Sequence, residues 1–258
     1  MTETEHGQKH LNSFVVIAAS VAAIAGVLFG FDTGVISGAI LFLKQDFHLT
    51  VHSEGLVVAS VLMGALAGSM ISGTVADYFG RRKLLLITSV IFAVATIGST
   101  VAESVHGLVV ARFFVGFAIG IASFVAPLYI SEISPARYRG ALVTLNQLAI
   151  TIGIFLAYVV DQAFVHYPNN WRYMFAMGVI PAVLLFIGML FLPRSPRWLV
   201  LKGHIEDAVR TLKKIRGEFY MESELSEIET SVIDRSGKLL RFPKWIWGGS
   251  LEPLWQHL

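Results

Sequence analysis

Two oppositely charged residues stand inside long apolar runs of this sequence. Asp32 lies about eleven residues before the end of the run 14–43, and Arg112 lies about five residues after the start of the run 107–131. A charged side chain at the centre of a membrane helix costs about 2.5 to 3.5 kcal/mol on insertion scales, so each charge requires a partner. If both runs cross a membrane, a rise of about 1.5 Å per residue brings the two side chains within roughly two helical turns of the same depth. The spacing predicts a buried pair of Asp32 and Arg112.

A pair of this kind can act as a proton switch. Two unpaired charges would both be unfavourable, whereas the pair compensates them, and a proton on Asp32 would release Arg112. We therefore expect Asp32 to bind and release a proton and Arg112 to respond to its charge. A static salt bridge that only joins the two helices is the alternative.

Polar side chains follow one face of the apolar run 141–164. Their spacing of three, four and seven residues places them on one side of a helix: Thr144, Gln147, Thr151 and Tyr158. Such groups would be unsatisfied against lipid, so we expect them to face a cavity or another helix. A neutral, hydroxylated ligand suits this stripe, with Gln147 as its strongest contact. Hydrogen bonds between helices are the alternative.

Six apolar runs supply the elements that position these residues. About 20 apolar residues cross a hydrocarbon core roughly 30 Å thick, and the chain is 55% hydrophobic and only 15% charged. The short breaks between the runs predict antiparallel neighbours. Gly and Ser within 64–73 and 116–123 predict close helix packing, although such residues are common in membrane helices in any case. We predict an all-α, multi-pass protein of the lipid bilayer whose membrane helices cover residues 14–43, 55–76, 84–102, 107–131, 141–164 and 172–192.

Lys and Arg residues gather in the breaks that follow the second, fourth and sixth runs, including 81–83 and 137–139. By the positive-inside rule these breaks are cytoplasmic, and an even number of spans then places both termini, including the tail 1–13, in the cytoplasm. The segment 193–240 is expected to be cytoplasmic as well. Within it, 204–217 and 222–233 have the spacing of short amphipathic helices.

The final stretch, 241–258, begins as if another membrane entry were coming. Trp245 and Trp247 could serve as anchors at the membrane interface. No seventh span follows them, and we expect an aberrant or truncated C-terminal tail.

Several function classes are disfavoured by composition. The chain has 20 Lys and Arg against 18 Asp and Glu, a balance too even to predict a nucleic-acid partner. It has no Cys, and His48 and His52 read as exposed loop residues, so we expect neither a metal nor a cofactor. Hydrolase motifs such as H-E-x-x-H and G-x-S-x-G are absent, which argues against an enzyme.

Five segments, in order along the chain, carry a family resemblance: GFDTGVISGA (30–39), GTVADYFGRRK (73–83), RFFVGFAIG (112–120), PLYISEISPARYRGALVTLNQ (127–147) and PRSPRWL (193–199). The chain resembles the sugar porter family of the major facilitator superfamily, and within it the bacterial proton symporters for xylose, arabinose and galactose. The resemblance implies a fold of twelve helices in two halves, each built from two inverted three-helix repeats. The predicted bundle 14–192 matches the N-terminal half.

The function that this resemblance implies is proton-coupled symport of a monosaccharide, a pentose or a hexose, by alternating access across the bacterial inner membrane. The partners would be the sugar, the proton and a second half or another copy of the chain. The alternative is a non-transporting truncated membrane protein that is degraded or that associates with full-length relatives.

Residue roles also follow from the resemblance. It implies that Asp32 is the proton-titrating carboxylate and Arg112 its partner, and that Gln147 and Phe29 contact the sugar. The polar stripe adds Thr144 and Thr151 to the expected sugar contacts. Family members that only equilibrate sugar tend to carry Asn at the position of Asp32, so the Asp favours symport.

The same resemblance implies a cytoplasmic charge network that holds the outward-facing state, with glycines that permit close turns. Its members would be Gly73, Asp77, Gly80, Arg81, Arg82, Glu132, Arg139 and Arg197. Arg194 stands where the family often has an acidic residue, which weakens one proposed latch. A positive-inside anchor with ordinary helix caps is the alternative for Arg81 and Arg82.

Overall fold

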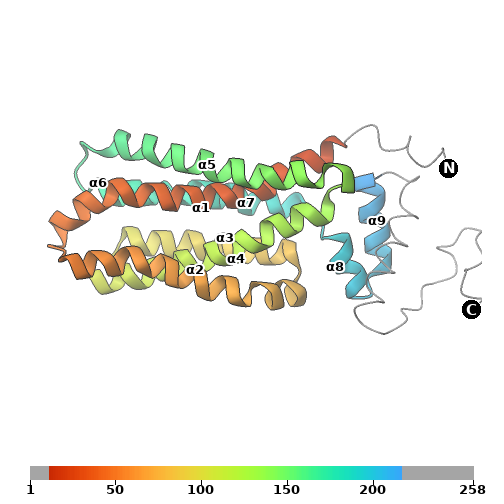
Figure 1. Ribbon diagram of the computed structural model, residues 1–258, viewed down its shortest axis with the longest axis horizontal. Coiled ribbons are helices and arrows are strands. Elements are labelled where there is room, and N and C mark those ends of the chain that lie inside the picture. Colours follow the sequence, from red (N-terminus) through yellow and green to blue (C-terminus); the bar gives the residue numbers. More distant parts are fainter. Residues whose placement is uncertain (1–11, 217–258) are drawn as a thin grey trace, which may run out of the picture.

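The computed structural model describes residues 12–216, and the described part of the chain is helical. The long helices lie side by side along one axis (Figure 1), and six helical spans are long and apolar enough to cross a membrane. The elements are α1 (Ser13–Asp46), α2 (Val51–Phe79), α3 (Arg81–Thr100), α4 (Val105–Ile133), a 3-10 turn (Ala136–Tyr138), α5 (Arg139–Phe164), α6 (Asn170–Ala176), α7 (Val179–Phe191), α8 (Pro196–Leu201) and α9 (Ile205–Arg216). The six-span architecture agrees with the predicted one.

The bundle has two distinct ends (Figure 1). We call the end that carries α8 and α9 the proximal end, and it also holds the connections from α2 to α3 and from α4 to α5. The opposite, distal end holds the connections from α1 to α2, from α3 to α4 and from α5 to α6. Asn12 joins the start of α1 to α9, since its Nδ2 donates to the carbonyl of Lys214 at 3.1 Å.

The sixth span differs from the prediction of one continuous helix over 172–192. It is divided into α6 and α7, which are separated by Met177 and Gly178. Pro181 has no backbone N–H to donate to the carbonyl of Met177, so the regular helical bond is lost at this point. The carbonyl of Met177 instead accepts from Ile180 at 3.1 Å, and Gly178 donates to the carbonyl of Phe175 at 2.9 Å. The sixth span is therefore a broken helix.

Close glycine contacts join two pairs of helices. α1 packs along α5, and α2 packs along α4. A Cβ atom on Gly30 would overlap the carbonyl oxygen of Ile150, and one on Gly64 would overlap that of Phe113. Gly68, Gly116 and Gly120 make equally close backbone contacts, so the predicted packing role of the small residues is confirmed for these positions.

The described part of the polar segment after the sixth span, up to residue 216, forms two short helices. α9 accounts for most of the amphipathic stretch predicted at 204–217. α8 begins with Pro196 at its first turn and is capped by Ser195, whose Oγ accepts from the backbone N–H of Trp198. The second predicted amphipathic stretch, 222–233, and the tail 241–258 lie outside the described residues.

Candidate functional site: an ion pair inside the spans

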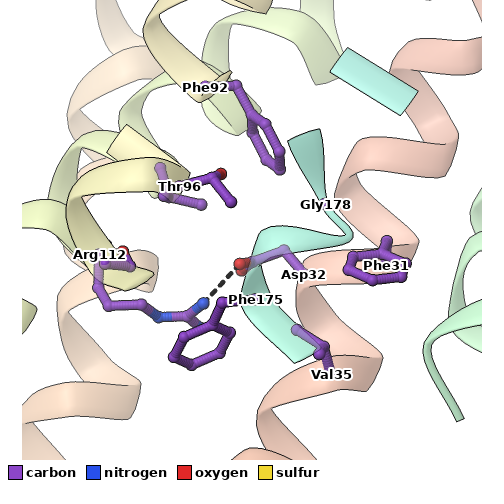
Figure 2. Close-up of a pocket in the computed structure, with 10 residues that line it drawn as sticks. Phe31, Asp32, Val35, Phe92, Thr96, Arg112, Phe175 and Gly178 are labelled. Carbon is purple, nitrogen blue, oxygen red and sulfur yellow. Dashed lines mark hydrogen bonds and ion pairs between the residues drawn. The ribbon is translucent and has the colours of Figure 1, made fainter. Parts of the chain in front are cut away.

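Asp32 of α1 and Arg112 of α4 meet in the interior of the bundle (Figure 2). Arg112 Nη1 donates to Asp32 Oδ1 at 2.5 Å. Asp32 is 6% exposed and Arg112 is 3% exposed, so the pair is removed from solvent. Residues 80 positions apart thus form the contact that the depth argument predicted.

The broken sixth span completes the surroundings of this pair. The guanidinium carbon of Arg112 lies 5.1 Å from the ring centroid of Phe175, a cation–π contact from α6. Gly178 follows at the break, and a Cβ on it would lie 3.4 Å from the ring of Phe31. The interruption therefore places an aromatic ring against the guanidinium and a small residue against Phe31, the neighbour of Asp32 in α1.

A small cavity adjoins the pair (Figure 2). It has a volume of about 10 Å³, close to the smallest that can hold one water molecule. Two buried polar atoms of its lining residues, Thr96 Oγ1 and Arg112 Nε, have no hydrogen-bond partner among residues 12–216. The lining residues come from α1, α3, α4 and α6 and the break after it: Phe31, Asp32, Val35, Phe92, Thr96, Ser99, Arg112, Val115, Phe175 and Gly178. The cavity thus has a polar wall next to the ion pair.

The contributions of α3 and α6 to this site had no signal in the sequence. Thr96 looks like an ordinary hydroxyl residue in a membrane helix, and Phe175 looks like one apolar residue among many. Only their positions across from Arg112 distinguish them. Asp161 was overlooked for a different reason, because it lies only three residues from the end of α5 at Phe164.

The polar stripe of α5 is exposed in this chain. Thr144, Gln147 and Thr151 are all exposed, and Tyr158 is 53% exposed. The hydroxyls of Thr144 and Thr151 donate to carbonyls one turn earlier in α5, those of Gly140 and Gln147. Of the two expected neighbours of the stripe, a cavity or another helix, no helix among residues 12–216 covers it.

Phe29 of α1 lies beside the contact between α1 and α5, as the polar stripe does, and it is 37% exposed. α1 and α5 run in the same direction (Figure 1), and they meet at Gly30 and Ile150. At about 100° of rotation per residue, Phe29 and Gln147 then lie on the same side of that contact. We call this side, with Phe29, Thr144, Gln147, Thr151 and Tyr158, the polar face.

A second charge cluster lies at the proximal end. Glu132, near the end of α4, accepts from Arg81 Nε at 3.1 Å and lies 3.0 Å from Arg81 Nη2. Arg81 also contacts Asp77 at 3.0 Å, and the side chain of Asp77 is 69% exposed. Ser195 donates to the other oxygen of Glu132 at 2.5 Å. The cluster therefore joins α2, α3, α4 and the start of α8.

Other predicted members of this network bind backbone carbonyls. Arg82 Nε donates to Met189 at 3.0 Å and its Nη2 to Leu190 at 2.6 Å, near the end of α7, where the helix dipole favours a cation. Arg139 Nε donates to the carbonyl of Ser131 at 3.0 Å. Arg197 forms no ion pair with Glu132 in the described structure, and only its charge acts on that carboxylate. The ion pair of Glu132 is the one with Arg81.

The two glycines of the predicted network differ. Gly80 links α2 to α3 with φ of 85°, and a Cβ on it would lie 2.9 Å from the Trp198 ring, so it does form a close turn. Gly73 lies inside α2 with nothing within 4 Å of an added Cβ, so the expected close turn at Gly73 is wrong. Trp198, which sequence reasoning missed, also donates from Nε1 to the carbonyl of Asp77 at 3.1 Å.

The two histidines near the distal end also differ. His48 is exposed in the connection between α1 and α2, as expected. His52 lies in the first turn of α2, not in a loop. Among residues 12–216 there is no group of three His, Asp or Glu residues placed to hold a metal ion.

Comparison with known proteins identifies the fold. Residues 18–252 match the family model described as Sugar (and other) transporter. The chain is 41% identical over 225 residues to the putative metabolite transport protein YwtG of Bacillus subtilis, covering 87% of this chain and 49% of YwtG. It is 43% identical over 219 residues to the galactose-proton symporter of Escherichia coli K12, covering 84% and 47%.

A solved structure of a transporter also matches the chain. The partially occluded, inward-open xylose transporter XylE from E. coli matches the chain with a TM-score of 0.82 at 33% identity, over 87% of this chain and 61% of XylE. The chain spans about half the length of the curated relatives that it matches, and its six spans match the N-terminal half of the XylE fold. The matched family consists of transporters and not of enzymes. The chain therefore belongs to the sugar porter family of the major facilitator superfamily, and is homologous to the N-terminal half of its galactose and xylose transporters.

Proposed function

We propose that this chain supplies the N-terminal half of a proton-coupled monosaccharide symporter. The observation that carries the proposal is the buried contact of 2.5 Å between Arg112 and Asp32 beside a cavity with a polar wall. Ionised Asp32 holds Arg112, and a proton on Asp32 removes the attraction and frees the guanidinium. Residues of four helical segments surround this pair, so its breaking would alter how those helices pack.

The sugar would bind on the polar face. Gln147 offers both a donor and an acceptor to sugar hydroxyls, and Phe29 offers an aromatic surface to a sugar ring. Thr144 and Thr151 extend the polar surface along α5. Exposure of all four residues supports this assignment, because no other helix of the described chain occupies the face. A second six-helix unit, from another chain or another copy, would then close the site.

The proximal cluster would act as the gate. Arg81 of α3 and Ser195 at the start of α8 both bind Glu132 of α4, so separation of the proximal end requires these bonds to break. We place this end, with both termini, at the cytoplasmic side of the bacterial inner membrane, because Arg81, Arg82 and Lys83 begin α3 at this end.

The helix pairing supports two inverted three-helix repeats within residues 14–192. In such a repeat, the first helix corresponds to the fourth and the second to the fifth. The contact of α1 with α5 then corresponds to a contact of α4 with α2. Both contacts are present and both are built on glycines. Alternating access in such folds is largely a rocking of one unit against another around a central site.

Uptake by proteoliposomes tests the proposal. The purified chain would be reconstituted alone and together with the C-terminal half of the galactose-proton symporter, with radiolabelled galactose and xylose and an inward proton gradient. We expect the mixture to accumulate sugar and a protonophore to abolish accumulation. Uptake that is indifferent to the protonophore would contradict proton coupling.

A non-transporting membrane protein is the second candidate, and the uncovered polar face favours it, since that face could associate with a relative without completing a transport site. Complex formation with the C-terminal half in the absence of any sugar exchange would establish this alternative.

A further inference from the structure

Asp161 is a further buried carboxylate within the spans, besides Asp32 and Glu132, and the proposed transport mechanism does not use it. It lies near the distal end of α5 and is 8% exposed. Neither of its carboxylate oxygens has a hydrogen-bond partner among residues 12–216. A carboxylate that is more than nine-tenths buried and unpartnered requires a physical explanation.

The backbone of α1 lies directly against this carboxylate. A Cβ atom on Gly38 would lie 2.5 Å from both Cγ and Oδ2 of Asp161. Gly38 continues the row of Gly26, Gly30 and Gly34, each of which permits a close approach of α1 to α5. Asp161 therefore occupies the distal end of the glycine-mediated contact between α1 and α5.

The site is separate from the ion pair of Asp32. Gly38 lies six residues beyond Asp32 on α1, about 9 Å along the helix axis at 1.5 Å per residue. Asp32 is directed to Arg112 of α4, whereas Gly38 faces α5. The carboxylate of Asp32 thus points from one side of α1, and the carboxylate of Asp161, from α5, lies against another side of α1.

The charged groups of the packed elements are engaged elsewhere. On α1, Lys44 pairs with Glu54 at 2.9 Å, and Asp46 accepts from the indole of Trp171 at 2.6 Å. On α6, Arg172 donates to the carbonyl of Thr100. The titratable groups that remain near this end of α4 and α5 form no ion pair or hydrogen bond with Asp161: His106, Arg112, Tyr158 and His166.

A proton is the simplest partner for this carboxylate. An ionised carboxylate is strongly disfavoured in a low-dielectric site unless a cation or hydrogen-bond donors compensate it, so burial favours the neutral acid. A metal cation would need several oxygen ligands, and the adjacent carbonyls of α1 and α5 are already used in helical hydrogen bonds.

We propose that Asp161 is a second proton-binding site of the bundle, and that its protonation permits the close packing of α1 and α5 at the distal end. Ionisation would place a charge against the backbone at Gly38, where the favourable contact with the Gly38 N–H is weaker than the cost of burial, and this favours separation of the two helices. The packed state is accordingly retained at low pH and lost as the pH rises. The proposal does not require Asp32 to carry the coupling proton.

Infrared titration tests proton binding directly. The complete chain would be studied in liposomes in an Asp32→Asn background, with and without Asp161→Asn, and with Asp46→Asn as the distal control. We expect a carbonyl band of a protonated carboxyl that disappears as the pH rises, is absent in the Asp161→Asn chain and persists in the control. Carbonyl spectra unchanged by Asp161→Asn at every pH would overturn the proposal. A band that sodium removes at constant pH would overturn it in favour of a cation site.

Distance measurements test the link to packing. The chain has no natural Cys, so spin labels can be attached at Leu41→Cys on α1 and Tyr167→Cys beyond α5, which are 59% and 57% exposed. We expect the distance between the labels to lengthen with rising pH in the parent chain and to stay short at every pH in the Asp161→Asn chain. An equal pH response in both chains would overturn the link. If Asp161→Asn fails to fold, the smaller neutral variant Asp161→Ser must show the same loss of response.

Discussion

Ser195 Oγ lies 2.5 Å from Glu132 Oε2, while the opposite oxygen of Glu132 is held by Arg81. One carboxylate near the end of α4 thus receives bonds from the start of α3 and from the residue that caps α8. The proximal cluster is therefore closed by the connection that follows the sixth span, and any opening of the proximal end must break bonds to Glu132.

Glu132 should contribute far more to stability than Asp77, although both contact Arg81. The side chain of Glu132 is 4% exposed and that of Asp77 is 69% exposed. We expect Glu132→Gln to lower the free energy of unfolding by about 3 kcal/mol, because it leaves the buried Arg81 without its main anion. Asp77→Asn should cost less than about 1 kcal/mol. Denaturant unfolding in micelles measures both, and equal losses would contradict the assignment.

Arg112 should be costly to remove only while Asp32 is charged. We expect Arg112→Leu to destabilise the bundle by about 3 to 5 kcal/mol, since it leaves a buried carboxylate unpaired. The double variant with Asp32→Asn should recover most of this loss. A double-mutant cycle of unfolding free energies checks it, and strictly additive losses would show that the two residues do not act as a pair.

Asp32→Asn should separate accumulation from exchange. The amide keeps the shape of the side chain but cannot bind or release a proton at neutral pH. We expect the reconstituted transporter with this change to lose accumulation driven by a proton gradient and to retain exchange of sugar across the membrane. Asp46→Asn is the control, because Asp46 lies at the distal end of α1. Gradient-driven accumulation that survives in Asp32→Asn would refute its coupling role.

Two glycines of α2 should respond oppositely to the same substitution. A Cβ on Gly64 would overlap the carbonyl of Phe113, whereas one on Gly73 would have nothing within 4 Å. We expect Gly64→Ala to cost about 1 to 3 kcal/mol through overpacking. Gly73→Ala should be neutral or stabilise by up to about 1 kcal/mol, since Ala is the better helix former. Thermal unfolding of the two variants compares them directly.

Orientation can be measured by cysteine labelling, because the chain has no Cys of its own. Val51→Cys lies at the distal end and is 89% exposed, and Glu206→Cys lies at the proximal end on α9. We expect a membrane-impermeant maleimide to label position 51 in spheroplasts and position 206 only after lysis. The reverse pattern would invert the proposed topology.

The spans were predictable because each is a long, local pattern of apolar residues, and their predicted bounds differ from the observed ones by a few residues at most for the first five. The pair of Asp32 and Arg112 was predictable because membrane depth can be counted along a helix. The break between α6 and α7 was not recognised, although Gly178 and Pro181 were visible, because such residues are tolerated in continuous membrane helices as well.

The sequence by itself determined the six spans, the two charges that must meet and the family motifs, since these depend on residue type and on spacing within single helices. Tertiary structure alone decided that Ser195 reaches Glu132, that Phe175 lies against Arg112 and that Asp161 is buried on Gly38 with no hydrogen-bond partner in the described part of the chain. These relations join residues distant in the chain and depend on the rotation of each helix about its axis, which no local pattern specifies.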